Sequence, residues 1–370
     1  MIKGYATAEG TAAYRARVGA AAAPGHFRDW AGLALSSVGL GTYLGAEDAA
    51  TDRAYEEAVT RAVGLGLNVL DSAVNYRGQR SERAIGAALR AMAGSGRFAR
   101  AEVVLASKGG FIPADSGDGA SRSGAQGYIR SGIVASGDIV AGCHCMTPRY
   151  LADQLERSRV NLGVETLDVY YLHNPEMQLQ EVDRPTFLAR IRAAFEFMEG
   201  AVAAGRIRWY GAATWTGLRQ EPAAADYLSL TELVGVATAV AGKSHHFRVL
   251  QLPYNLGMTE AFTARNQRAG RERVSLLEAA RRLDLFVMTS ASIYQGKLAS
   301  GLPPVVAQFL PGLDTDAQRA LQFVRSTPGV GTALVGMARA AHVEANARVC
   351  AVPPLPWNDF RRLFQGDESA

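Results

Sequence analysis

Several absences narrow the class of protein that this sequence encodes. The 370-residue chain contains no run of about 18 apolar residues, so we expect no membrane-spanning helix. The Ala-rich stretch near the N-terminus lacks the apolar central block of a secretory signal. Cysteine is rare, with Cys143, Cys145 and Cys350 alone, which argues against a disulfide framework and favours a cytoplasmic protein. The net charge of +4 is mild, and no stripe of basic and aromatic residues occurs, so we expect no nucleic-acid partner.

Lysine is also scarce. Only four of the 39 basic residues are lysine, and the chain otherwise uses arginine. The two side chains differ in shape and in titration, so a lysine kept inside an apolar stretch indicates a position that needs a compact ammonium group. Lys108, at the end of VVLASK, occupies such a position.

The chain alternates regularly between short apolar runs and longer amphipathic segments. Eight strand–helix pairs in this order favour a parallel sheet with right-handed crossovers, and their number predicts a closed (β/α)8 TIM barrel. The alternative is an open doubly wound sheet, but no GxGxxG motif follows the first strand. We expect the strands at 35–42, 67–72, 102–108, 167–173, 207–214, 248–255, 285–291 and 331–336. We expect the helices at 52–66, 81–92, 147–163, 187–205, 230–242, 275–284, 316–326 and 340–349.

A single barrel domain is expected over residues 1–370. Residues 1–35 form an N-terminal extension that we expect to cap the barrel floor, and residues 351–370 form a C-terminal tail. Residues 109–146, rich in Gly, Ser and Asp, form an insertion after the third strand. Barrels keep their active sites at the carboxyl ends of the strands, so this insertion is either a lid over the substrate or a surface loop.

Titratable side chains end three successive strands. Asp71 ends the second strand, Lys108 the third and His173 the fourth, while Tyr76 lies five residues after Asp71. In a barrel these strand ends converge at one rim, so we expect the four side chains to meet. Taken singly, each has a structural interpretation: a turn-forming Asp, a packed Tyr, a satisfied His. Their occurrence together favours a catalytic site over four separate structural roles.

The expected chemistry is proton transfer. Asp71 and Lys108 can pair, which offsets the desolvation that each would suffer alone. The ammonium should also stabilise a phenolate and thereby lower the pKa of Tyr76 from its usual value of about 10. Tyr76 would then serve as a proton donor, and His173 would donate a hydrogen bond to a substrate oxygen.

These residues lie in segments that together resemble the aldo-keto reductases. The matching segments, from about residue 33 to about residue 350, are GLGT, LDSAVNY, SERAIGAAL, VLASK, LDVYYLHNP, IRWYGAATW, LQLPYN, SIYQGKLASG and VGMARAAHVEAN. The resemblance implies a (β/α)8 barrel that uses a nicotinamide dinucleotide, usually NADPH. It also implies Tyr76 as general acid/base, Lys108 and Asp71 as the pair that tunes it, and His173 as the residue that orients the carbonyl.

The resemblance further implies a set of cofactor-binding residues. Near the nicotinamide it implies Asp71, Gly41, Thr42, Thr214 and Gln251. Around the pyrophosphate it implies Ser290, Ser292, Gln295, Gly296 and Leu298. At the adenosine end it implies Gly336, Met337, Arg339, His342 and Asn346.

The chain departs from the family pattern at a few of these positions. Ala213 and Thr214 replace the usual Ser-Asn, and Ala345 replaces the Glu that usually precedes the adenine-binding Asn. The usual contacts to the 2′-phosphate are not reproduced residue for residue, although Arg339 and His342 can serve. We therefore expect NADP, with NAD as the alternative.

The sequence thus predicts a monomeric cytoplasmic oxidoreductase that reduces an aldehyde or ketone, or oxidises the corresponding alcohol, with a homo-oligomer as the alternative. Two other functions stay open: a Schiff-base lyase with Lys108 as nucleophile, and a dinucleotide-binding regulatory or accessory protein with little turnover. Cys143-His144-Cys145 lacks the spacing of a zinc site, so no metal is expected.

Overall fold

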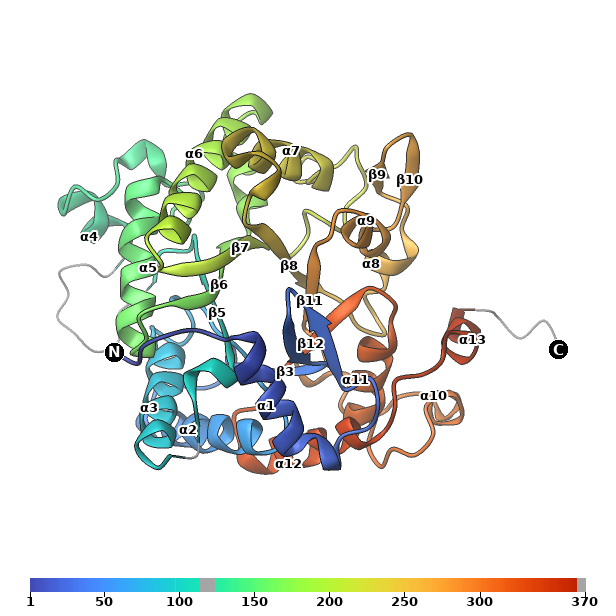
Figure 1. Ribbon diagram of the computed structural model, residues 1–370. Coiled ribbons are helices and arrows are strands. Elements are labelled where there is room, and N and C mark those ends of the chain that lie inside the picture. The colour runs from blue at the N-terminus through green and yellow to red at the C-terminus, as the bar shows by residue number, and fades with distance from the viewer. Residues whose placement is uncertain (97, 114–123, 365–370) are drawn as a thin grey trace.

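Eight parallel strands close into a barrel in the computed structural model, which describes residues 1–96, 98–113 and 124–364 (Figure 1). Their order around the barrel is β11-β12-β3-β4-β5-β6-β7-β8. The predicted (β/α)8 barrel is therefore confirmed. The strands are β3 (Val38–Gly41), β4 (Val69–Asp71), β5 (Val104–Gly109), β6 (Leu167–His173), β7 (Ile207–Ala213), β8 (Phe247–Pro253), β11 (Phe286–Ser290) and β12 (Val330–Gly336).

Helices surround this barrel, and each of the eight predicted helices is present. Every residue of β4, β5 and β6 is buried, as expected for parallel strands whose outer face is covered by helices. The helices are α1 (Ala8–Val18), α2 (Ala49–Gly64), α3 (Arg80–Gly94), α4 (Gly124–Arg130), α5 (Pro148–Leu162), α6 (Arg184–Ala203), α7 (Leu230–Ala241), α8 (Glu260–Thr263), α9 (Leu276–Arg282), α10 (Pro304–Phe309), α11 (Asp316–Ser326), α12 (Ala340–Ala347) and α13 (Trp357–Phe360). None of the described helices is long and apolar enough to cross a membrane.

The N-terminal extension closes the floor of the barrel, where the strands begin. It contains α1 and a hairpin of β1 (Phe27–Trp30) and β2 (Leu33–Ser36), which the sequence analysis did not predict. The indole of Trp30 lies 4.8 Å from that of Trp209 and 5.1 Å from the ring of Phe286, between centroids. At the same end, Asp168 accepts hydrogen bonds from the backbone N–H of Ala6 and from Arg100. These contacts join the extension to the barrel.

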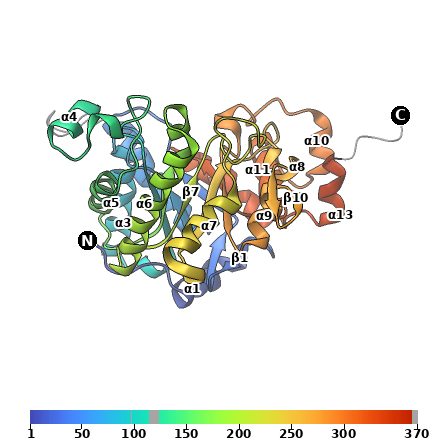
Figure 2. The same ribbon diagram turned by 90° about the horizontal axis from the view of Figure 1, so that it is seen from above.

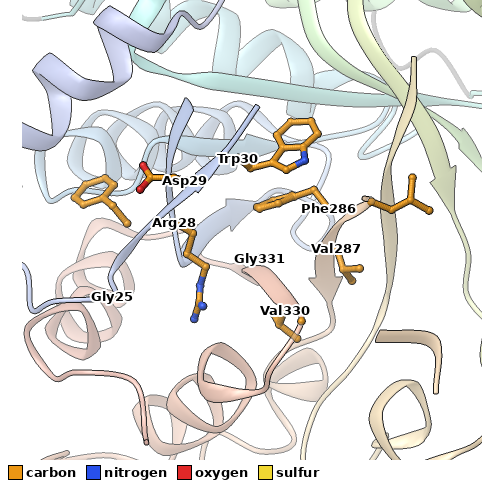
Figure 3. Close-up of a pocket in the computed structure, with 11 residues that line it drawn as sticks. Gly25, Arg28, Asp29, Trp30, Phe286, Val287, Val330 and Gly331 are labelled. Atoms are coloured by element: carbon orange, nitrogen blue, oxygen red, sulfur yellow. The ribbon is translucent and has the colours of Figure 1, made fainter. Parts of the chain in front are cut away.

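A cavity of about 420 Å³ also lies at the floor (Figure 3). The hairpin and the first residues of β11 and β12 line it. Two charged side chains in its lining already have protein partners: Arg28 donates to the carbonyl of Arg325, and Asp29 pairs with Arg15. The cavity is at the opposite end of the barrel from the titratable strand ends, and we assign it no ligand.

The described part of the insertion packs beside α5. Tyr128 of α4 lies 5.3 Å from Tyr150, between ring centroids, and its hydroxyl accepts a hydrogen bond from Gln154. Cys145 is buried in the same small cluster. In Figure 2, α4 lies on the side of the molecule opposite to α1 and β1, at the outer edge. Residues 114–123 fall outside the described residues, and a lid over the barrel mouth stays a prediction.

A second hairpin and the C-terminal tail complete the structure. The hairpin consists of β9 (Gln267–Ala269) and β10 (Glu272–Val274). In the tail, Phe360 of α13 packs within 5.7 Å of Phe323 and 5.6 Å of Phe262, between ring centroids.

Candidate active site

The barrel brings three of the predicted residues to neighbouring strand ends. Asp71 ends β4 and pairs in register with Ala106 of β5, two residues before Lys108. His173 ends β6, two residues after the register partner of Lys108. The closed, parallel arrangement therefore holds the carboxylate, the ammonium and the imidazole at one rim, as the sequence predicted.

Lys108 and Asp71 form a buried ion pair. The Nζ atom of Lys108 donates to Oδ2 of Asp71 at 2.6 Å and to the carbonyl of Ser72 at 2.8 Å. Gln251 of β8 donates from Nε2 to the second oxygen, Oδ1 of Asp71, at 2.8 Å. Both carboxylate oxygens therefore have a donor, which is what keeps a charge this deep in the protein tolerable.

Electrostatics keeps Lys108 protonated. Burial alone would lower the pKa of its ammonium, but the carboxylate of Asp71 and the phenol of Tyr76 outweigh that effect and raise the pKa above its usual value. Lys108 is therefore a fixed positive charge at neutral pH. An unprotonated amine, which a nucleophile requires, is disfavoured at this position.

Tyr76 lies on the turn after β4, with its ring beside the ion pair. The Nζ atom of Lys108 is 4.9 Å from the ring centroid, and the imidazole of His173 is 5.8 Å away, between centroids. We expected the ammonium to lower the pKa of Tyr76, and that expectation is wrong in its net direction. Burial raises the pKa, and Lys108 opposes only part of the rise. Tyr76 therefore retains its proton at neutral pH.

His173 is neutral and has a free ring nitrogen. Burial, followed by the charge of Lys108 and the nearby imidazole of His144, holds the pKa of its imidazole well below the usual range. Its Nδ1 atom is buried and has no hydrogen-bond partner among the described residues. The ring of Phe111, from the first residues of the insertion, stands edge-on to the imidazole at 4.8 Å between centroids. A neutral imidazole can donate from one nitrogen without carrying a charge.

The residues expected at the nicotinamide end lie at further strand ends around the same rim. Gly41, which ends β3, pairs in register with both Asp71 and Gly336. Thr42 is buried, and its hydroxyl donates to the carbonyl of Asp71 at 3.1 Å. Thr214, after β7, is buried, and its Oγ1 atom has no partner in the described part of the chain.

The residues expected at the pyrophosphate and adenosine ends follow β11 and β12, which are adjacent in the barrel. The loop after β11 has left-handed backbone at Ala291, Tyr294 and Gln295, a conformation that non-glycine residues adopt at a cost and that gathers at functional sites. Ser292 is buried in this loop, with an Oγ atom that lacks a partner among the described residues. Ser290 and Leu298 are partly buried, and Gln295 and Gly296 are exposed.

After β12, the chain leads directly into α12. Gly336, Arg339 and His342 are exposed there, whereas Met337 and Asn346 are buried. Arg339 is the N-cap residue of α12, and its side chain makes no capping hydrogen bond. A helix N-terminus with exposed basic residues is suited to binding an anion.

Several residues at the site were not selected from the sequence. Phe111 follows Lys108-Gly109-Gly110 directly, and this position next to a predicted catalytic strand end could have identified it as a site residue. His144 was considered only as part of a Cys-His-Cys motif and a metal site, but its imidazole hydrogen-bonds the carbonyl of His173. Within the described ranges, no group of three or more His, Cys, Asp or Glu is placed to hold a metal ion. All three cysteines are free.

Comparisons with known proteins agree with the barrel fold. The model of the aldo/keto reductase family matches residues 37–233, which is more than half of the chain. A search of curated proteins finds no match.

Among solved structures, the chain is similar to an aldo/keto reductase from Klebsiella pneumoniae in complex with NADP and acetate, with 23% identity, a TM-score of 0.60, and coverage of 92% of this chain and 94% of that one. It is also similar to an aldo-keto reductase from Bacillus halodurans in its holo form, with 18% identity, a TM-score of 0.62 and coverage of 91% and 95%. A third similar structure is a glycerol dehydrogenase from Gluconobacter oxydans, with 17% identity, a TM-score of 0.64 and coverage of 92% and 95%. At these identities the likeness concerns the fold.

Proposed function

The chain belongs to the aldo/keto reductase family, and from this premise we propose that it is an NADP-dependent oxidoreductase of a small carbonyl compound or alcohol. The observation that carries the proposal is the buried Lys108–Asp71 ion pair, which lies beside the phenol of Tyr76 and the neutral imidazole of His173. These are a proton donor, its electrostatic support and a hydrogen-bond donor at one rim.

Unpartnered groups along the rim support a dinucleotide as the cofactor. Buried hydroxyls normally have partners, so Oγ1 of Thr214 and Oγ of Ser292, which lack one among the described residues, fit a bound polar molecule. The left-handed loop after β11 and the basic N-terminus of α12 fit its phosphates. Two similar structures from Klebsiella pneumoniae hold NADP and NADPH. We propose NADP for this chain, with NAD as the alternative.

The proposed mechanism assigns each step to a side chain. Bound NADPH supplies the hydride. His173 donates a hydrogen bond to the carbonyl oxygen and so orients the substrate. Tyr76 gives its proton to the oxygen as negative charge develops there, and the ammonium of Lys108 stabilises the phenolate that forms. Asp71 holds Lys108 in place, and Gln251 holds Asp71.

The pKa directions favour the reductive sense at neutral pH. A phenol whose pKa is raised by burial stays protonated and can act as an acid. In the oxidative sense the phenolate is required, and it becomes available only at higher pH. We therefore propose that carbonyl reduction proceeds efficiently near pH 7 and that the rate of alcohol oxidation has an alkaline optimum.

The Schiff-base lyase is less well supported. The Lys108 amine is held by two acceptors and kept charged by Asp71, so it is a poor nucleophile. A binding protein with little turnover differs from the proposed enzyme only in its rate. The monomeric state and the cytoplasmic location of the protein remain predictions.

Replacement of Tyr76 by phenylalanine tests the proposal. The change removes the acid and keeps the ring, so NADPH-dependent reduction of a panel of simple aldehydes should fall by roughly 10²- to 10⁴-fold. NADPH binding, followed by tryptophan fluorescence, should be unchanged. Tyr5→Phe is the matched control, because Tyr5 lies at the floor against Arg208, and it should retain wild-type rates. Equal rates in wild type and Tyr76→Phe would refute the assigned acid.

A further inference from the structure

The insertion reaches the barrel rim through one short antiparallel pairing, between Phe111 and His144. The backbone N–H of Ile112 donates to the carbonyl of Cys143 at 2.8 Å, and that of Cys145 donates to the carbonyl of Gly110 at 2.9 Å. The residue between the two cysteines, His144, is 1% exposed. The pairing directs His144 inward, against the last residue of β6.

His144 hydrogen-bonds the backbone of His173. Its Nε2 atom lies 2.7 Å from the carbonyl oxygen of His173, which can only accept, so Nε2 carries the proton. On the other side of the ring, Gln178 donates from Nε2 to Nδ1 of His144 at 2.8 Å. Burial lowers the pKa of His144 to about 4, so the ring is neutral and this tautomer is maintained.

A further hydrogen bond fixes the amide of Gln178. Arg190 of α6 donates to its Oε1 atom, which leaves the Nε2 side facing His144. Gln178 belongs to a short 3₁₀ helix, η4 (Pro175–Gln180), that begins two residues after His173. The chain of contacts runs from α6 through η4 and the insertion to the end of β6.

The backbone at Gly110 packs closely against the hydrogen bond between His144 and the carbonyl of His173. A Cβ atom on Gly110 would lie 2.7 Å from the carbonyl oxygen of His173 and 2.8 Å from Nε2 of His144, and Gly110 has a φ of +151°. Phe111 follows, and its ring stands edge-on to both imidazoles, 5.3 Å from His144 and 4.8 Å from His173 between centroids. The two paired segments of the insertion, 110–112 and 143–145, therefore contact both the backbone of His173 and one side of its ring.

We propose that His144 is a positioning residue, which sets the orientation of the His173 imidazole through the hydrogen bond to the His173 carbonyl and the shared contact with Phe111. The inference rests on the proposed function, in which His173 orients the substrate. His173 depends on such support because its own Nδ1 has no partner among the described residues to hold the ring. The insertion thereby contributes to the active site through its contacts with His173.

The test compares two variants of His144 in the full chain. His144→Leu removes the donor, whereas His144→Gln keeps an N–H group that can reach the carbonyl. Cys143→Ala is the control, because it alters the neighbouring residue without touching this hydrogen bond. His144→Asn, which is too short to reach, replaces His144→Leu if that protein does not fold.

Two measurements are made on each protein. The first is the ¹H–¹⁵N NMR signal set of the His173 ring, which reports its tautomer and environment without any turnover. The second is kcat and KM for aldehyde reduction. In His144→Leu we expect shifted His173 signals and a kcat lower by roughly 10- to 100-fold, as for a misplaced orienting group, with NADPH binding unchanged. In His144→Gln both should return close to wild type, and Cys143→Ala should match wild type throughout.

The outcomes separate this inference from the proposed function. Unshifted His173 signals in His144→Leu would overturn the positioning role, whatever the activity. Shifted signals that His144→Gln does not restore would also overturn it, because the hydrogen bond would then not be the cause. If His173→Gln itself reduces aldehydes at the wild-type rate, the proposed role of His173 fails, and the NMR comparison still decides whether His144 holds the ring.

Discussion

Replacing Lys108 by methionine isolates the energetic role of the buried ion pair. Methionine has a similar length and volume but carries no charge. The change leaves Asp71, which is 4% exposed, with Gln251 as the donor to Oδ1 and no ammonium at Oδ2. Removing one partner of a buried pair strands the other charge away from water, so we expect the free energy of unfolding to fall by about 3–5 kcal/mol.

The companion variant removes both charges. In Lys108→Met/Asp71→Leu no charge is left buried, and replacement of a whole buried pair by apolar groups is often close to neutral. We therefore expect the double variant to be more stable than Lys108→Met alone, by about 2 kcal/mol or more. Because the residues are in contact, their effects should be strongly non-additive. Both variants should lack reductase activity, so they should differ in stability while being equally inactive.

The assay is equilibrium unfolding in urea at pH 7, followed by tryptophan fluorescence and by circular dichroism. Agreement of the two probes shows whether a single transition is being measured. Lys243→Met is the control, since Lys243 is exposed and its loss should change stability by less than about 0.5 kcal/mol. A cost below about 1 kcal/mol for Lys108→Met, or a double variant less stable than the single one, would refute the reasoning.

Two further predictions concern the floor of the barrel. Gly331→Ala should destabilise the protein by about 1–3 kcal/mol, because the added Cβ would lie 2.2 Å from Cζ of Phe286. Gly64→Ala is the control, since its Cβ would meet no atom of the described residues within 4 Å, and it should not be destabilising. Thermal unfolding of the two variants measures the difference. Burial lowers the pKa of His26 from 6.5 to about 4, so its neutral form stabilises the fold fully above pH 6.5, and up to about 3 kcal/mol is lost as the pH falls from 6.5 toward 4. Urea unfolding at several pH values should show a shallower pH dependence in His26→Gln, and an unchanged slope would contradict this assignment.

Much of the barrel was predictable because its signals are local. Alternating apolar runs and amphipathic segments depend on neighbouring residues, and they placed all eight barrel strands and the eight helices between them. The hairpin at 27–36 was missed because each of its strands is only four residues long. Trp30 packs against Trp209 and Phe286, which lie far along the chain, so its role could not be recognised from neighbouring residues.

The titratable groups that end the strands could be identified from local sequence, since Asp71, Lys108 and His173 follow recognisable apolar runs. How these groups act depends on contacts that the folded barrel creates. Closure of the barrel brings Gln251, 180 residues away, to Asp71, and packing of the insertion brings His144 to the carbonyl of His173. Burial, which sums contributions from the whole fold, reversed the expected direction of the Tyr76 pKa. Strand ends are encoded locally, but desolvation and long-range hydrogen bonds exist only once the chain has closed on itself.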